Sequence, residues 1–278
     1  MEENAIKDLF DLTGRVAVIT GGAGLLGYKH AEIIARAGGI PVLVDLAAAQ
    51  PETKAAQLAA EYSVKSLGCA IDITKADQVT SLLEAILERF GTVDILINNA
   101  ANNPKVESPS GRAWSRLENF PLAVWEADLA VGLTGAFLCS QVIGAEMARR
   151  KKGVIVNVAS DLAVIAPDQR LYRQEGLPED RQPVKPVTYS VVKTGLVGLT
   201  RYLATYWAHC GVRVNAISPG GVYNGQPEDF VKRLATLIPL SRMAHVDEYQ
   251  GAILFLCSDA SSYMTGTNLV IDGGRSCW

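Results

Sequence analysis

A tyrosine and a lysine four positions apart, Tyr189 and Lys193, have the spacing that most directly suggests chemistry. On a helix, this spacing puts the phenol and the ammonium group on one face. A free phenol titrates near pH ~10, but a neighbouring cation stabilises the phenolate. Lowering that pKa by about three units requires roughly 4 kcal/mol of preferential stabilisation of the anion. The pair therefore predicts a general acid/base; the alternative is an ordinary buried helix whose lysine reaches to solvent.

A glycine-rich turn between a strand and a helix predicts a dinucleotide site. The apolar residues 15–19 lead into the turn 20–27, and an amphipathic helix follows to about residue 37. Glycines let the backbone turn tightly and approach a pyrophosphate, which sits on the helix N-terminus. In this context we expect the turn to hold a cofactor rather than to be a plain reversal of the chain.

An acidic residue, Asp45, ends the second apolar strand, 40–44. At that place a carboxylate accepts hydrogen bonds from the adenosine ribose hydroxyls and repels a 2′-phosphate. The alternative role is that of a helix cap or turn residue. Asp45 therefore points to NAD as the cofactor, with NADP the weaker candidate.

The composition limits the class of protein. The 278 residues are 49% hydrophobic with a net charge of −3 and no long basic run, which argues against nucleic acid as a partner. Residues 1–7 are polar and do not resemble a signal peptide, and no apolar run has the length of a membrane span, so no membrane partner is expected. Five scattered cysteines and three distant histidines predict free thiols, a cytoplasmic location and no metal site.

Strand and helix patterns alternate along the rest of the chain. Further apolar strands are expected at 66–71, 94–97, 154–158, 212–217 and 268–271, with long helices at 75–90, from about 125 to 150 and from 189 onward. Apolar strands between helices require a parallel sheet covered by helix layers. The sequence thus predicts an α/β fold as a single domain over 1–278, with no internal repeat and no linker.

The segment 161–188 breaks this pattern. It carries four prolines and many charges of both signs, including Arg170 and Arg173 on either side of Tyr172. Long loops without periodicity are often binding lids, although a solvated insertion without a role is the alternative. Because both ends of the segment adjoin candidate catalytic positions, we expect these three residues to contact a substrate.

The assembled motifs resemble those of the short-chain dehydrogenase/reductase family, and the similarity covers nearly the whole chain. The matching residues are Thr20, Gly21, Gly27, Asp72, Asn98, Asn99, Ala100, Ser160, Tyr189, Lys193, Asn215, Pro219, Gly220, Asp272, Gly273 and Gly274. The resemblance implies a Rossmann-type three-layer sandwich with a seven-stranded parallel sheet, and a nicotinamide cofactor at the strand ends. It also implies a homotetramer or homodimer built on the long helices. The inserted segment and the C-terminal tail are similar to those of dehydrogenases of bacterial surface-sugar synthesis.

The resemblance also assigns roles to single residues. Tyr189 would transfer the proton, Lys193 would lower its pKa and hold the nicotinamide ribose, and Ser160 would hydrogen-bond the substrate oxygen. The positions implied to bind the cofactor are Gly21, Gly24, Leu26, Gly27, Asp45, Leu46, Asp72, Ile73, Asn99, Ala100, Ala101, Tyr189, Lys193, Pro219, Gly220 and Val222.

Two further positions depart from the family pattern. Leu25 stands at the middle glycine of the cofactor turn, so either Gly24 substitutes or the turn is reshaped. Gly132 stands where the family has an asparagine that fixes a water in a proton relay. A glycine inside a helix costs about 1 kcal/mol, and it could mark a kink whose freed carbonyl binds that water.

The sequence therefore predicts an NAD-dependent oxidoreductase that interconverts a secondary alcohol and a ketone on a small polar substrate, a sugar or sugar derivative. One alternative is a 3-oxoacyl thioester reductase, against which Asp45 counts because reductive synthesis usually draws on NADPH. The other is a catalytically silent cofactor-binding or scaffold protein, favoured by Gly132 but opposed by the intact Ser160, Tyr189 and Lys193.

Overall fold

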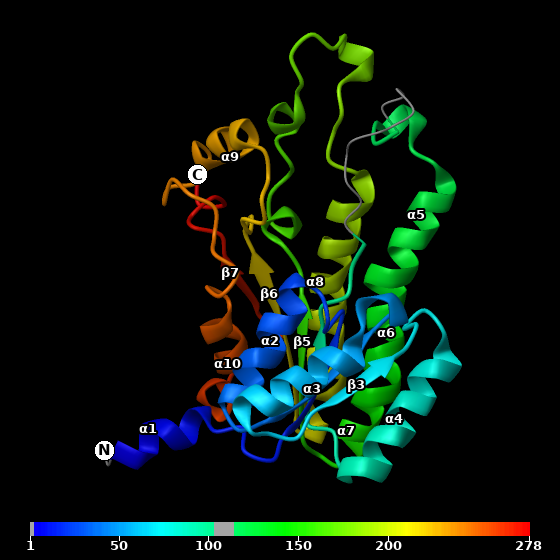
Figure 1. The fold of residues 1–278 in the computed structure, drawn as a ribbon, viewed down its shortest axis with the longest axis vertical. Coiled ribbons are helices and arrows are strands. Elements are labelled where there is room, and N and C mark those ends of the chain that lie inside the picture. The colour runs from blue at the N-terminus through cyan, green and yellow to red at the C-terminus, as the bar shows by residue number, and fades with distance from the viewer. Residues whose placement is uncertain (1–2, 103–113) are drawn as a thin grey trace.

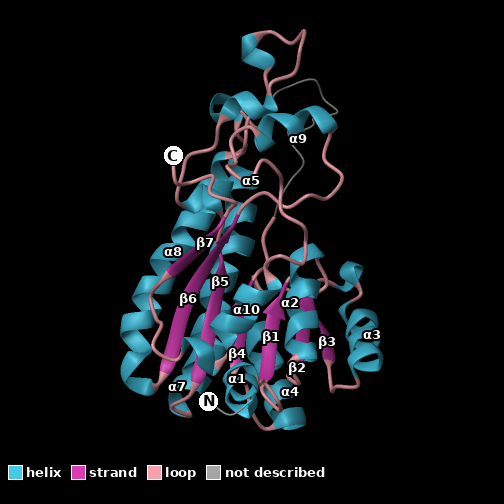
Figure 2. Ribbon diagram, turned by 90° about the vertical axis from the view of Figure 1, so that its left-hand side faces the viewer, coloured by secondary structure: helices cyan, strands magenta, loops and turns pink. Residues whose placement is uncertain are grey.

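Seven parallel strands form one sheet in the order β3-β2-β1-β4-β5-β6-β7 (Figure 2). The structure, a computed structural model, describes residues 3–102 and 114–278. The strands are β1 (Val16–Thr20), β2 (Ile40–Asp45), β3 (Leu67–Ala70), β4 (Ile95–Asn98), β5 (Gly153–Val158), β6 (Val212–Pro219) and β7 (Asn268–Ile271). The order reverses between β1 and β4, and at such a switch point the carboxyl ends of the strands leave a crevice for a ligand.

Helices cover both faces of the sheet (Figure 1). The helices of the described residues are α1 (Glu3–Phe10), α2 (Leu25–Arg36), α3 (Pro51–Tyr62), α4 (Ala76–Phe90), α5 (Leu122–Leu129), α6 (Gly135–Cys139), α7 (Ala145–Arg149), α8 (Val187–Trp207), α9 (Glu228–Ala235) and α10 (Gln250–Cys257). Of these, α1 projects away from the sheet and α9 lies beyond the carboxyl ends of the strands. Two π-helical segments, η3 (Ala130–Thr134) and η4 (Ser140–Gly144), join α5, α6 and α7 into one long helix.

Side chains of alternate strand residues point to opposite faces of the sheet and pack into two separate cores. On one face, Val18 and Ile155 pack with α4, the long helix and α8. On the other face, Ile19 and Val156 pack with α2, α3 and α10. Because the inner strands β1, β2, β4, β5 and β6 are buried on both sides, the sequence of each is a continuous apolar run rather than an alternating one. This is why the strands could be located from the sequence, and the predicted fold class is confirmed.

A buried polar network joins the central strands to the helices below the site. Asn98 donates from Nδ2 to Asn157 Oδ1 at 2.8 Å and to Ser140 Oγ at 3.1 Å, and Asn157 donates to Thr200 Oγ1 at 2.8 Å. Buried polar groups stabilise a core only when they are paired. These bonds therefore fix β4 and β5 against the long helix and α8. The candidate catalytic residues Tyr189 and Lys193 lie on α8, toward its N-terminus.

Some element boundaries differ from the predicted ones. No helix is predicted for the polar N-terminal residues, but they form helix α1, and α8 begins at Val187, two residues before Tyr189. The long helix begins at Leu122 rather than near Trp125, and its two π-helical segments carry no periodicity signal that could have placed them. The predicted loop over 102–121 lies in part outside the described residues.

The long helix, Leu122–Arg149, is apolar enough by length and composition to cross a bilayer, and only 28% of its most apolar stretch is buried. A single helix that passes on length and composition is weak evidence for a membrane span, because helices packed in a protein core pass the same test. The inner face of the long helix packs on the sheet through Cys139, Ile143 and Met147. Its outer face exposes Phe137, and the adjacent α8 exposes Tyr202 and Tyr206.

The segment 161–188 forms an arm that projects beyond the carboxyl ends of the strands (Figure 1). It contains three short 3-10 helices, η5 (Asp161–Ala163), η6 (Gln169–Tyr172) and η7 (Glu179–Arg181). The buried side-chain amide of Gln182 holds the two sides of the arm together. Its Oε1 accepts a hydrogen bond from the Gln174 amide, and its Nε2 donates to the carbonyls of Gln174 and Leu177. At its base, Leu171 packs on α9 with Leu234.

Candidate active site

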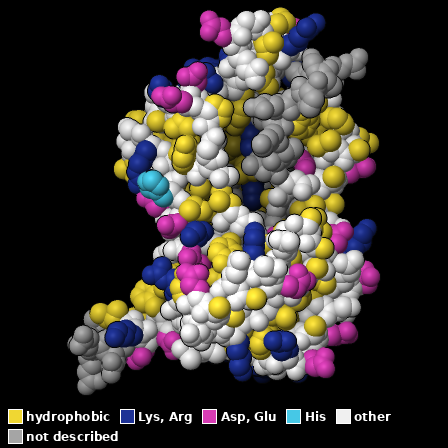
Figure 3. All heavy atoms as spheres, viewed as in Figure 1, with side chains coloured by type: hydrophobic (Ala, Val, Ile, Leu, Met, Phe, Trp, Pro, Cys, Tyr) yellow, Lys and Arg dark blue, Asp and Glu magenta, His cyan; other side chains and the backbone are white. Residues whose placement is uncertain are grey.

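A cavity of about 470 Å³ opens at the carboxyl ends of the central strands. Figure 3 shows the molecule hollowed on this side, with lysine and arginine side chains visible inside the hollow. The glycine turn lies at one end of the cavity, and Leu171 and Phe230 form an apolar wall at the other. A cavity that combines a loop for phosphate with a partly polar, partly apolar end can hold a dinucleotide and a small substrate together.

The glycine turn has the geometry of a phosphate cradle. Gly21 has φ +61°, a conformation that disfavours other residues, and a Cβ on Gly27 would lie 2.0 Å from the Gly21 carbonyl oxygen. Asn99 holds the turn from β4, since its Nδ2 donates to the carbonyls of Thr20 and Gly21 at 3.0 and 3.2 Å. The backbone of the turn is therefore fixed beside the N-terminus of α2, where a pyrophosphate binds.

The departure at Leu25 leaves this turn intact. Leu25 is the first residue of α2, half its side chain is exposed, and it lines the cavity. Gly24 is the N-cap with φ −79°, which any residue can adopt. Gly24 therefore needs no glycine-specific conformation, and its use is spatial: a Cβ there would lie 3.1 Å from the Gly21 carbonyl oxygen.

Asp45 lies at the end of β2, beside the glycine turn. Its Oδ2 accepts a hydrogen bond from the Ala23 amide at 3.1 Å and its Oδ1 accepts one from the Leu46 amide at 2.9 Å. Lys54 of α3 donates to the carbonyl of the same Ala23. The Asp45 carboxylate thus has lone pairs left for a ribose hydroxyl. The ammonium group of Lys54 lies nearby, since both side chains bond the backbone of Ala23.

Many of the predicted cofactor positions meet in the cavity. Those that line it are Gly21, Gly24, Leu26, Asn99, Ala100, Ala101, Tyr189, Lys193, Pro219, Gly220 and Val222. Gly27 lies behind the turn, and Asp45 and the exposed Leu46 lie beyond its end. Past β3, the Asp72 carboxylate is bonded to Thr74, and Ile73 is buried in the core. The cofactor contacts expected of Asp72 and Ile73 therefore stay predictions.

The three predicted catalytic residues come together from two elements. Ser160 follows β5, while Tyr189 and Lys193 lie one turn apart on α8, and all three line the cavity. Lys193 is buried, and its Nζ donates to the Val158 carbonyl at 2.7 Å and lies 5.8 Å from the centre of the Tyr189 ring. The backbone bond to β5 holds the ammonium group beside the phenol.

The electrostatics of the pair differ from the sequence-based expectation. Burial raises the pKa of Tyr189, a hydrogen bond with Ser160 opposes that change, and the charge of Asp161 adds to it. Lys193 is not among the groups that shift the pKa of Tyr189 in this structure, and the pKa of Lys193 is itself lowered to about 8, by burial first and by Lys185 second. Lysine proximity alone therefore does not outweigh desolvation of the phenolate.

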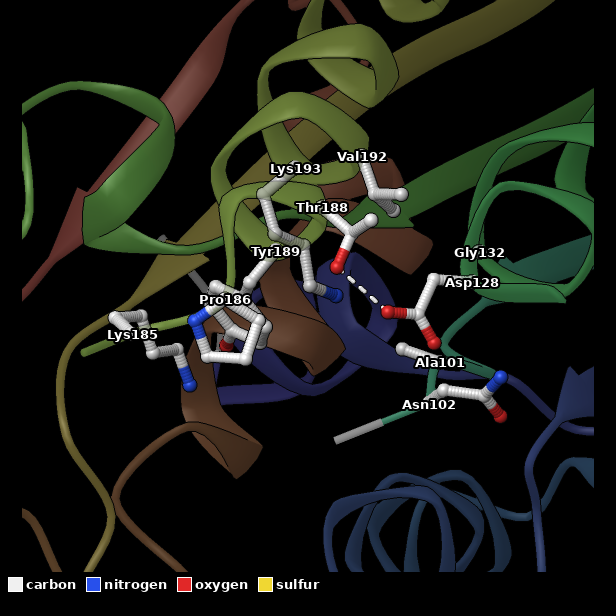
Figure 4. Close-up of a pocket in the computed structure, with 10 residues that line it drawn as sticks. All are labelled: Ala101, Asn102, Asp128, Gly132, Lys185, Pro186, Thr188, Tyr189, Val192 and Lys193. Carbon is white, nitrogen blue, oxygen red and sulfur yellow. Dashed lines mark hydrogen bonds between the residues drawn. The ribbon is translucent and has the colours of Figure 1, made fainter. Parts of the chain in front are cut away.

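Gly132 lies in η3, opposite α8. A Cβ at this position would lie 2.5 Å from Val192 Cγ1, so the Val192 side chain would have to shift before an asparagine could stand there. A separate cavity of about 10 Å³, close to the size that one water requires, lies beside it (Figure 4). Among the described residues that line it, Asp128 is the acidic one, and its Oδ2 accepts a hydrogen bond from Thr188 Oγ1 at 2.6 Å. The long helix is π-helical at Gly132, and the buried carboxylate of Asp128 lies about one turn before it.

Two of the three predicted substrate residues lie outside the cavity. Arg170 is exposed and paired with Asp168 at 2.6 Å, and Arg173 is exposed and paired with Glu179. Tyr172 does line the cavity, where its ring lies 5.6 Å from that of Phe230. The two arginines pair with acids of their own segment outside the cavity, whereas η6 packs on α9 and places Tyr172 in the cavity wall. Contact of the three residues with a substrate stays a prediction.

Sequence reasoning missed three charged residues of the cavity. Lys185 has its Nζ 3.8 Å from the centre of the Tyr189 ring, and burial lowers its pKa to about 8. Asp161 and Arg275 form a buried ion pair at 2.7 Å. Lys185, one helical turn before Tyr189, and Asp161, directly after Ser160, carried a positional signal. Arg275, 114 residues from its partner, carried none.

The fold and this site together define a nucleotide-dependent oxidoreductase of the Rossmann type. The family model described as short chain dehydrogenase matches residues 15–172, and one described as enoyl-(acyl carrier protein) reductase matches residues 180–276. The chain belongs to the short-chain dehydrogenase family. It is an NAD(P)-dependent oxidoreductase that interconverts CH–OH and carbonyl groups.

Relatives match along almost the whole chain. D-threitol dehydrogenase of Mycolicibacterium smegmatis is 36% identical over 98% of this chain and 97% of its own length. NAD-dependent glycerol dehydrogenase of Listeria innocua is 33% identical over 95% of both. The crystal structure of gluconate 5-dehydrogenase from Burkholderia cenocepacia, in complex with NADP and tartrate, has a TM-score of 0.85 at 27% identity and covers 98% of this chain and 99% of that one.

Proposed function

We propose that this enzyme oxidises a secondary hydroxyl group of a polyol or related sugar derivative with NAD, and that Tyr189 is its general acid/base. The supporting observation is the meeting of Ser160, Tyr189 and Lys193 in the cavity that also holds the glycine turn. The relatives named for threitol and glycerol support a small hydroxyl-rich substrate.

The substrate end of the cavity suits such a compound. Tyr172, Asn224 and Gln226 supply hydroxyl and amide groups, and Lys185 supplies an ammonium group. Phe230 lies among them as an apolar surface. A polyol presents hydroxyls on both sides of a carbon chain, so it can use several of these donors and acceptors while its carbons lie against the ring.

The residues fit a nicotinamide dinucleotide, because a Cβ at Gly27 would close the cradle and the N-terminus of α2 adjoins it. When bound, that cofactor accepts the hydride of the oxidised carbon. Tyr189, as phenolate, takes the hydroxyl proton, and Ser160 hydrogen-bonds the reacting oxygen. Lys193, held by the Val158 carbonyl, stabilises the phenolate once the substrate site is formed.

The direct test is turnover with NAD on a panel of matched compounds: C3 to C6 polyols, aldonic acids, simple secondary alcohols and a 3-oxoacyl thioester with reduced cofactor. We expect the highest kcat/KM for a polyol or its acid. Preferred turnover of the thioester would replace this proposal by a reductase of acyl chains. Cofactor binding without turnover of any class would favour a silent protein.

Replacing Asp45 by asparagine is expected to shift the cofactor preference toward NADP. Asparagine keeps an acceptor for the Ala23 amide but removes the charge that repels a 2′-phosphate. Lys54, which bonds the carbonyl of the same Ala23, would then attract that phosphate. The ratio of kcat/KM for NAD over NADP should fall about tenfold or more, since a change of ~1.4 kcal/mol suffices. Glu88→Gln, a loss of charge on the exposed side of α4, is the control. A wild-type enzyme that prefers NADP would contradict the assignment.

We also propose that the chain assembles with a second copy through the long helix and α8. Phe137, Tyr202 and Tyr206 are 45%, 63% and 56% exposed there. Monomers rarely expose a contiguous patch of large apolar side chains, so such a patch marks an interaction surface. Phe137→Asp combined with Tyr206→Asp should convert a dimer or tetramer into monomers in sedimentation experiments, whereas Leu177→Asp on the arm should not. A wild-type chain that sediments as a monomer at micromolar concentration would refute this.

A further inference from the structure

One ion pair links the C-terminal tail to the catalytic end of β5. Asp161 and Arg275 have side chains only 5% and 8% exposed, and their Oδ2 and guanidinium atoms lie 2.7 Å apart. Among the ion pairs of the described residues, 3–102 and 114–278, it is the one in which both partners are this deeply buried. Such pairs stabilise a protein poorly compared with apolar residues of the same size, so their presence in a cavity suggests another use.

The tail is shaped to bring Arg275 into the cavity. Gly273 and Gly274 have φ of +68° and +90°, and both are conformations that glycine adopts without strain. Asp272 fastens the turn, because its carboxylate accepts hydrogen bonds from the amides of Gly274 and Ser276 at 2.9 and 2.8 Å. Arg275 therefore lines the same cavity as Tyr189, although it is not part of any strand or helix.

The other oxygen of Asp161 holds Ser160. Asp161 Oδ1 lies 2.8 Å from Ser160 Oγ and 2.8 Å from the Leu162 amide. A carboxylate can only accept hydrogen bonds, so the serine donates its single hydroxyl hydrogen to Asp161. The Ser160 oxygen also accepts a hydrogen bond from the Leu162 amide at 3.2 Å. The Ser160 hydroxyl lowers the pKa of Tyr189 only when its hydrogen turns to the phenolate, so Asp161 and the phenolate compete for that hydrogen.

The charge of Asp161 also acts on the tyrosine. It raises the pKa of Tyr189, in addition to the larger effect of burial, and the hydrogen bond with Ser160 opposes both. The other titratable groups around Asp161 and Tyr189 are Lys185, Lys193, Tyr172 and Tyr249, from the arm, α8 and the approach to α10. Arg275 differs from these because its guanidinium group donates a hydrogen bond directly to the Asp161 carboxylate.

We propose that Asp161 and Arg275 are positioning residues for the reaction: Asp161 orients the Ser160 hydroxyl, and Arg275 neutralises the charge that Asp161 would otherwise place beside Tyr189. This inference rests on the proposed role of Tyr189 as the general acid/base. The C-terminal tail is then part of the electrostatic setting of the active site rather than only a closing segment of the fold.

The two members of the pair act on the tyrosine in opposite directions. Oxidation of an alcohol needs the phenolate, so kcat/KM rises with pH through the pKa of Tyr189 in the free enzyme. Arg275→Gln leaves Asp161 uncompensated, which raises that pKa and moves the rising limb to higher pH. Asp161→Asn removes the anion and leaves the guanidinium, which moves the limb to lower pH.

The experiment measures pH profiles of kcat/KM for alcohol oxidation in the full-length enzyme. We expect a shift of about one pH unit upward for Arg275→Gln and about one unit downward for Asp161→Asn, the lower end of what a close charge produces. At a pH below the limb, the upward shift appears as a roughly tenfold loss of rate. The double variant should return the limb close to its wild-type position, and Arg275→Lys should keep it there.

Asp161→Asn keeps the shape of the side chain and an acceptor for Ser160, so its profile can be measured even where Arg275→Gln does not fold. Arg149→Gln, which removes an exposed ion pair with Glu146 on α7, is the matched control and should leave the limb in place. If the rising limb of Asp161→Asn stays at its wild-type pH while Tyr189→Phe is inactive, the inference about Asp161 and Arg275 is overturned and the proposed function stands. Turnover by Tyr189→Phe overturns the proposed function instead.

Discussion

Replacement of Tyr189 by phenylalanine is expected to lower kcat at least ~10²-fold while the dissociation constant for NAD changes little. The phenylalanine ring fills the same space on α8, so the cavity keeps its shape. The lost atom is the phenolic oxygen, which is hydrogen-bonded to Ser160 and belongs to the ring that Lys193 adjoins. In the proposed binding mode, the cofactor is held mainly by the glycine turn and the end of β2, which this substitution does not change.

Single-turnover oxidation of the preferred polyol measures the first effect, and quenching or enhancement of NADH fluorescence measures the second. Tyr206→Phe, on the same helix but exposed, is the matched control and should behave as wild type. Any residual activity of Tyr189→Phe should lose the rising limb of its pH profile, since the group that titrates is gone. Near-normal turnover would remove Tyr189 from the mechanism.

The sequence was sufficient for the sheet and for the residues fixed by strand ends. In a parallel sheet buried on both faces, each strand is an apolar run and its carboxyl end faces the site. Ser160 after β5 and the glycine turn after β1 therefore met in one cavity, as expected. Tyr189 and Lys193 followed from helical spacing alone, because α8 is regular over that turn.

Other features depend on contacts that no local pattern encodes. Arg170 and Arg173 are expected at the substrate because the ends of their segment adjoin catalytic positions, but both pair with acids of their own segment outside the cavity. Arg275 reaches the site only because two glycines adopt positive φ and Asp272 caps the turn. The size of desolvation at Tyr189 likewise depends on packing by the arm, which periodicity does not predict.

The second large effect is expected at Gly27, where alanine should weaken NAD binding about 10²-fold. Gly27 lies in the first turn of α2, and on helix propensity alone alanine would be favoured there by up to ~1 kcal/mol. The added Cβ, however, would lie 2.0 Å from the carbonyl oxygen of Gly21 and 2.9 Å from Nδ2 of Asn99. Both contacts are with the turn itself and the side chain that holds it.

The turn must therefore move by an ångström or more, and a displacement of that size in a positioning element costs on the order of 10²-fold. Gly198→Ala is the control, because Gly198 also lies in a helix and a methyl group there would meet no atom within 4 Å beyond the backbone of its own helix. We expect it to bind NAD as wild type and to unfold at a slightly higher temperature, whereas Gly27→Ala should lose cofactor affinity in NADH titrations even where its melting temperature is unchanged. Wild-type affinity in Gly27→Ala would mean that the turn can shift at no cost, and the close contact between Gly27 and Gly21 would then have no part in binding the cofactor.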